Sequence, residues 1–134
     1  MKLTVRRFKF GFVIILTLLF PLFGSAAEGY KLVCDEPVYD FGTVDQSAVV
    51  TNVFTIRNEG DLTFPLRHIY ASCSCTKGKL DKRMIGPGET AKFTAVFKAV
   101  RRTGLQKKSL KILSKTSKKP ALVLYMNGSV TQGK

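Results

Sequence analysis

Apolar and polar residues alternate along short segments of this chain, and turn-forming residues separate these segments. The clearest case is 91–98, where Ala91, Phe93, Ala95 and Phe97 occupy every second position. A period of two is that of a β-strand with one buried face. After residue 27 no segment of useful length has the period of a helix, so the sequence predicts an all-β domain.

Further alternating segments predict more strands, with turn residues about every ten positions. The expected strands cover 38–41, 49–58, 62–75, 91–98, 107–115 and 121–130, and a basic loop is expected after Thr76. About seven short strands without an internal repeat indicate an immunoglobulin-like β-sandwich. Seven side chains are expected in its core: Phe54, Ile56, Phe93, Phe97, Leu110, Ile112 and Leu124.

The N-terminal segment has the composition of a secretory signal peptide. Four cations and no acid precede an apolar run at 11–23, and small residues follow at 24–27. This run is shorter than the ~20 residues that a membrane-spanning helix needs, so cleavage after Ala26 or Ala27 is expected. An uncleaved membrane anchor is the alternative. The sequence therefore predicts a signal peptide at 1–27 and an exported protein of the periplasm or cell envelope.

The remaining chain, 28–134, is long enough for one domain with a single core. Its charge is unevenly distributed. Residues 28–89 contain seven Lys or Arg and nine Asp or Glu, whereas residues 90–134 contain eleven Lys or Arg and no acid. In the predicted strand 107–115, Lys107, Lys111 and Lys115 are expected to form an exposed stripe. It either discourages strand addition or contacts an anionic envelope surface.

Cys73 and Cys75 are the candidate chemical site of the sequence, and only Ser74 separates them. In an extended strand, residues i and i+2 project from the same face, roughly 6.5 to 7 Å apart. A disulfide needs Cβ atoms about 3.8 Å apart. Direct bridging would therefore need a local turn and would be strained. The alternatives are buried structural thiols, a bridge to Cys34, a bridge between chains, a reactive thiol, or capture of a soft metal.

For a metal, the two thiolates favour Cu(I), with a further ligand from Met84, Met126 or His68. Zinc is less favoured, because a closed tetrahedral site needs four ligands. Thiol exchange is a third possibility, although the usual redox spacing places two residues between the cysteines. No resident cofactor and no small-molecule substrate are identified.

Five short motifs, in this order and spacing, resemble those of the bacterial family DUF1573, a domain of unknown function. They are DFGTV at 40–44, NEG at 58–60, SCSCT at 72–76, IGPGE at 85–89, and residues 124–128 with Val130. The resemblance implies an exported bacterial protein with an immunoglobulin-like fold of the Hydin and major-sperm-protein type. Domains of that type bind other proteins. Ser74 stands where the family usually has Gly, and Cys34 is additional to the motif.

Two classes of function follow. The first is a non-catalytic binding or scaffolding module of the envelope, whose partner is another envelope protein or an anionic envelope surface. The second is a factor that handles Cu(I) or thiols through Cys73 and Cys75. An enzyme is not expected, because the chain has no recognisable catalytic motif. Nucleic acid is disfavoured by export, and no aromatic residues lie among the lysines of 107–119 as a base-stacking site would require.

Overall fold

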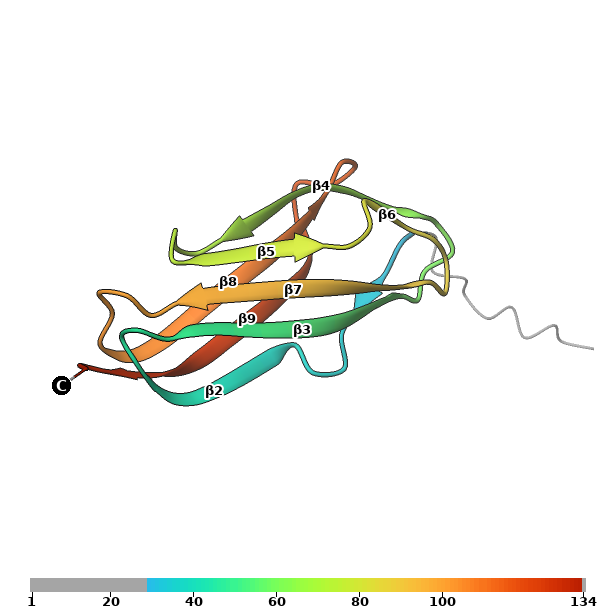
Figure 1. The fold of residues 1–134 in the computed structure, drawn as a ribbon. Helices are drawn as coiled ribbons and strands as arrows, with labels where there is room; N and C mark the ends of the chain where they lie inside the picture. Colours follow the sequence, from blue (N-terminus) through green and yellow to red (C-terminus); the bar gives the residue numbers. More distant parts are fainter. Residues whose placement is uncertain (1–28, 134) are drawn as a thin grey trace, which may run out of the picture.

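The computed structural model describes residues 29–133 as a sandwich of two β-sheets (Figure 1). The predicted signal peptide at 1–27 lies outside the described residues. The prediction of an all-β sandwich is confirmed, with nine strands rather than about seven among the described residues. These are β1 (Leu32–Val33), β2 (Val38–Asp45), β3 (Val49–Asn58), β4 (Phe64–Ala71), β5 (Thr76–Leu80), β6 (Met84–Ile85), β7 (Thr90–Lys98), β8 (Gly104–Ser114) and β9 (Pro120–Thr131).

One sheet has the strand order β1-β3-β7-β5, and the other has the order β2-β9-β8-β4-β6. All pairings are antiparallel except that of β2 with β9, which is parallel. In Figure 1 the strands β3, β5 and β7 form one layer, and β8 and β9 cross behind them. Among residues 29–133 no helix is long and apolar enough to cross a membrane. Consecutive strands β4 and β5 belong to different sheets, so the chain crosses the sandwich between them.

Three strands were not expected from the sequence, namely β1, β5 and β6. The most informative is β5, which contains two lysines and was predicted to be a basic loop. It pairs along its whole length with β7, from Thr76 opposite Phe97 to Leu80 opposite Phe93. Gly78 faces the Phe93 ring, and a Cβ there would lie 2.3 Å from a ring carbon. Packing against β7 therefore overrides the low strand propensity of this segment.

The predicted core is confirmed. All seven side chains expected there are buried, with at most 3% of their surface exposed. Phe54 and Phe93 meet edge to face with ring centroids 6.4 Å apart, and Phe41 stacks on Phe97 at 5.2 Å. The pairing of β4 with β8 has a register shift between Leu66 and His68. The contact of Phe41 with Phe97 joins the two sheets, whereas Phe54 and Phe93 are cross-strand neighbours within one sheet.

Asn58 is the most completely bonded polar side chain of the core, with none of its surface exposed. Its amide nitrogen donates to the carbonyl oxygens of Leu62 and Ile85, at 2.8 and 2.9 Å. Its amide oxygen accepts from the backbone N–H groups of Lys31 and Gly60, both at 3.0 Å. Since every donor and two acceptor sites are used, the side chain is buried without leaving a polar group unpaired.

The backbone of Asn58 joins a second turn to the same place. Its N–H donates to the carbonyl of Glu89 at 3.0 Å, and its carbonyl accepts from the N–H of Gly88 at 2.7 Å. The Glu89 carboxylate accepts from the N–H of Gly86 and from Lys82. Together the Lys82 ammonium and the Gly86 N–H lower the pKa of Glu89. The motifs at 58–60 and 85–89, distant in sequence, therefore form one bonded unit.

Replacing Phe93 by Ala is expected to lower the free energy of unfolding by about 3 to 5 kcal/mol, because the lost transfer energy adds to the cost of a cavity. The side chain is fully buried and contacts both Gly78 and Phe54. Urea unfolding followed by circular dichroism measures the loss. Lys92→Ala, at the exposed neighbouring position, is the control and should change stability by no more than about 0.5 kcal/mol. Equal losses in both variants would contradict the assigned faces of β7.

Candidate functional site

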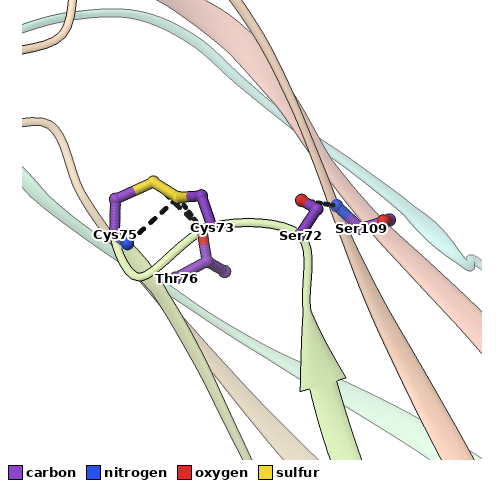
Figure 2. Close-up of a disulfide and its surroundings, with 5 residues drawn as sticks. All are labelled: Ser72, Cys73, Cys75, Thr76 and Ser109. Atoms are coloured by element: carbon purple, nitrogen blue, oxygen red, sulfur yellow. Dashed lines mark hydrogen bonds between the residues drawn. A yellow bond between two sulfur atoms is a disulfide. The ribbon is translucent and has the colours of Figure 1, made fainter.

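The two cysteines lie in the turn by which the chain crosses from one sheet to the other. Both ends of this turn are fixed by hydrogen bonds to the sheets. Ser72 donates its N–H to the carbonyl of Ser109 at 2.9 Å, and its hydroxyl accepts from the N–H of Ser109 at 3.0 Å (Figure 2). At the other end, the carbonyl of Cys75 accepts from the N–H of Lys98 at 2.8 Å. The turn is thus fixed to β8 on one side and to the end of β7 on the other.

Within this turn Cys73 and Cys75 form a disulfide with their Cα atoms 5.2 Å apart. The prediction of an extended segment was wrong, because the backbone must reverse to reach the opposite sheet. The N–H of Thr76 donates to the carbonyl of Cys73 at 3.2 Å and closes the turn. The Cα separation is within the usual range of about 4.4 to 6.8 Å for a disulfide. The local turn that direct bridging requires is therefore present.

Two polar groups contact the sulfur atoms (Figure 2). The N–H of Cys75 donates to Sγ of Cys73 at 3.0 Å. The hydroxyl oxygen of Thr76 lies 3.7 Å from the sulfur of each cysteine. Thr76 is buried, whereas both cysteines are partly exposed. Cys73 therefore has one more hydrogen-bond donor than Cys75, and solvent reaches the disulfide.

Cys34 is free and distant from this disulfide. Its neighbour Val33 pairs with Arg57 of β3, and Arg57 in turn pairs with Thr90 of β7. Thr76, next to the disulfide, pairs with Phe97 of β7. Thr90 and Phe97 are seven residues apart along β7, which corresponds to roughly 23 Å at 3.3 Å per residue. A disulfide needs Cα atoms within about 7 Å, so the fold does not allow a bridge from Cys34 to either of the other cysteines, which was one of the alternatives that the sequence left open.

The environment of Cys34 is also unlike that of a reactive thiol. Burial raises the pKa of the Cys34 thiol, a backbone hydrogen bond from Glu36 opposes this, and the carboxylates of Asp35 and Glu36 raise it further. The residue lines a depression together with β2 and β3, near Tyr39 and Phe54. Its thiolate is therefore disfavoured at neutral pH.

The three further ligands expected for Cu(I) are not gathered at the cysteine turn. Met84 pairs with Pro65 at the start of β4, six residues and roughly 20 Å from the strand end that leads to the turn. Met126 is buried in the core, and His68 is exposed within β4. Throughout residues 29–133 no group of three or more His, Cys, Asp or Glu side chains is placed to hold a metal. Binding of Cu(I) by Cys73 and Cys75 would first require their reduction.

The lysines of the predicted stripe are all exposed. Lys107 and Lys111 project from the outer face of β8, and Lys115 follows the end of that strand. Register shows which side chains share this face: Lys111 is directly opposite Tyr70 of β4, and Lys107 is opposite Asn127 of β9. Alternation along β8 alone therefore does not identify the side chains of β4 and β9 that lie beside these lysines.

Exposed apolar side chains adjoin these lysines. Tyr125 is opposite Ser109 on β8 and Val38 on β2. The exposed fractions are 54% for Tyr70, 41% for Tyr125 and 50% for Val38. We call this surface the Tyr–Lys face, and define it by five residues: Val38, Tyr70, Lys107, Lys111 and Tyr125. The two tyrosines were missed because the pairing of β4, β8, β9 and β2 is long-range.

Two shallow depressions lie on the Tyr–Lys face. One contains Tyr70 and Lys111, and the other contains Tyr125 and Lys107. Their remaining lining residues include three more cations and no acid: Arg67, Lys108 and Lys118. Lys108 is on the core side of β8, where its ammonium lies 6.0 Å from the centroid of the Phe97 ring, and desolvation and the charge of Arg102 lower its pKa. The other four cations carry the positive charge of the face. The face is therefore both partly apolar and positively charged.

The fold is similar to those of several solved structures. The chain is similar to a protein of unknown function from Porphyromonas gingivalis W83, with a TM-score of 0.63, 15% identity, and coverage of 83% of this chain and 51% of that one. It is similar to PapD-like domain 7 of human CEP192, with a TM-score of 0.54, 10% identity, and coverage of 78% and 87%. It is also similar to the secreted serine protease VesC of Vibrio cholerae, with a TM-score of 0.56, 16% identity, and coverage of 75% of this chain and 23% of that one.

These identities show the fold alone, and the chain spans only about half of the Porphyromonas protein. The family model described as "Protein of unknown function (DUF1573)" matches residues 32–130. The chain therefore belongs to this family, as its motifs had indicated. No curated protein matches the chain significantly.

Replacing both cysteines of the disulfide by Ser is expected to lower the free energy of unfolding by no more than about 2 kcal/mol, because closing a loop of three residues removes little entropy from the unfolded chain. Urea unfolding of Cys73→Ser/Cys75→Ser beside the oxidised parent measures the difference. The parent unfolded in the presence of reductant is the control for the substitutions themselves. A loss above about 4 kcal/mol would identify the disulfide as the main staple of the domain.

Proposed function

We propose that the domain is a non-catalytic binding module of the bacterial cell envelope, which binds an acidic segment of another envelope protein on the Tyr–Lys face. The observation that supports this most directly is the combination of exposed tyrosines and cations in depressions without an acid. A contiguous patch of exposed apolar side chains marks an interaction site more often than scattered single apolar side chains do. The envelope location rests on the predicted signal peptide at 1–27.

The charge of the face favours an acidic partner. Among the described residues the ion pairs are Lys31 with Glu59, Arg57 with Glu59, and Lys82 with Glu89. Lys107 and Lys111 have no carboxylate partner within the described chain, so both ammonium groups remain available. Complementary charge steers association and fixes the orientation of a partner.

The aromatic residues favour a protein over a lipid surface. Tyr70 and Tyr125 line depressions, into which side chains of a partner fit. Tyrosine is enriched in the centres of protein interfaces, where it contributes large contact area at low entropic cost. An anionic membrane surface needs lysines but not depressions, and it is therefore the competing outcome of the test.

Replacing Lys107 and Lys111 by Gln is expected to weaken binding of a fluorescent poly-glutamate peptide about three- to tenfold, because each exposed ion pair contributes up to about 1 kcal/mol. Fluorescence anisotropy at low and physiological salt measures the dissociation constant. Affinity of the parent should fall as salt rises, since exposed charges are screened.

The matched control is Lys77→Gln/Lys79→Gln, which makes the same charge change on the exposed side of β5 in the other sheet. It should leave the affinity close to that of the parent. Equal weakening by both double variants would show that total charge, not the Tyr–Lys face, determines binding. Binding of phosphatidylglycerol vesicles without binding of the peptide would replace the protein partner by a membrane surface.

A further inference from the structure

We infer that the Cys73–Cys75 disulfide is a thiol–disulfide exchange site, which accepts electrons from a pair of thiols on another polypeptide. Exchange at this turn does not depend on the Tyr–Lys face, because every group involved belongs to residues 72–76. Three features of the turn support the inference: the small loop that the disulfide closes, the accessibility of its sulfurs, and the donors directed at Cys73.

A disulfide in this position contributes little as a structural staple. It closes a loop that contains only Ser74 between the two cysteines, whereas stabilisation by a disulfide grows with loop length. The turn is already fixed without it, by the bonds between Ser72 and Ser109 and between Lys98 and Cys75. The reduced form is therefore expected to keep the same fold, which lets the pair change oxidation state without unfolding.

The sulfurs are accessible to an attacking thiolate. Both cysteines are partly exposed at a turn on the surface, and Figure 2 shows the sulfur–sulfur bond at the tip of that turn. An attacking thiolate can therefore reach the disulfide from solvent.

The donors at the turn distinguish the two sulfurs. Sγ of Cys73 accepts the N–H of Cys75 at 3.0 Å and lies 3.7 Å from the Thr76 hydroxyl. Sγ of Cys75 has only the contact with that hydroxyl. Hydrogen bonds to a charged group favour its charged form, and the sulfur that is more stable as a thiolate is the better leaving group. Cys73 is therefore the sulfur that is released.

The exchange proceeds in two balanced steps. A substrate thiolate attacks Sγ of Cys75, a substrate–Cys75 disulfide forms, the Cys73–Cys75 bond breaks, and Cys73 leaves as the thiolate. The second thiolate of the substrate then attacks the substrate sulfur of the mixed disulfide. A disulfide forms within the substrate, and Cys75 leaves as the thiolate. The substrate has lost two electrons and gained a disulfide, and the chain has gained two thiols after protonation. Return to the starting state requires a second disulfide as the electron acceptor.

The first test is equilibration of the mature domain with buffers of reduced and oxidised glutathione, followed by acid quenching and mass analysis. Cys34→Ser is used beside the parent, so that only the pair is counted. The disulfide fraction is expected to follow the glutathione ratio while the circular dichroism spectrum stays that of the folded domain. A disulfide that stays fully oxidised in excess reduced glutathione would overturn the inference, since structural disulfides resist the glutathione pool.

The second test is alkylation of the reduced domain by limiting iodoacetamide at neutral pH, with each cysteine followed by peptide mass. Cys73 is expected to react first and Cys34 last. Thr76→Val, which keeps the side-chain shape and removes the hydroxyl, should slow Cys73 about threefold or more. Thr94→Val, the same change on the neighbouring strand β7, should not slow it. Equal rates at Cys73 and Cys75 would overturn the assignment of Cys73 as the stabilised thiolate, and no effect of Thr76→Val would overturn the role of the Thr76 hydroxyl as a donor to the sulfurs.

Discussion

The hydrophobic core between the two sheets determines where the chain must cross from one sheet to the other, and the candidate redox site lies at one of these crossings. Phe93 and Phe97 of β7 face the core, and the pairing of β5 with β7 places Thr76 opposite Phe97. The preceding strand β4 belongs to the other sheet. Only residues 72–75 are available for the crossing, which requires a tight turn and brings the two cysteines together.

The family motifs divide between two ends of the sandwich. The motifs at 58–60 and 85–89 meet around the buried side chain of Asn58, which joins β1, β3 and β6. The motif at 72–76 lies about seven residues further along β7. One end of the domain is thus fixed by a fully satisfied hydrogen-bond network, and the other end contains the accessible disulfide. We interpret the end that contains Asn58 as structural and the end that contains the disulfide as the reactive site.

The two remaining motifs also contact each other. Phe41 of the motif at 40–44 covers Gly128 in the last motif, where a Cβ would lie 2.2 Å from the Phe41 ring. Phe41 in turn stacks on Phe97. The glycine therefore allows the parallel pairing of β2 with β9 and the closure of the core at that edge. The Tyr–Lys face lies on the outside of these same strands, so its geometry follows from this packing.

Local periodicity was enough to predict the core, because burial of one face leaves a period of two in each long strand. It did not predict β5, where Lys77 and Lys79 give a basic composition and the strand forms through packing of Gly78 against Phe93. The cysteine geometry was mispredicted for a related reason. The spacing of Cys73 and Cys75 was interpreted on an extended backbone, whereas a sheet crossing is set by long-range pairing that one segment does not encode. The tyrosines of the Tyr–Lys face come together only through that same pairing.

Peptide mapping of the protein purified without reductant, under non-reducing conditions, tests the account most directly. After alkylation of free thiols and cleavage with trypsin, Cys73 and Cys75 fall in the single peptide 68–77, and Cys34 falls in 32–57. We predict that peptide 68–77 is unlabelled and lighter by two hydrogens than its reduced form, while 32–57 carries one label. A disulfide that links 68–77 to 32–57 or to a second copy of 68–77, or two labels on 68–77, would contradict the account.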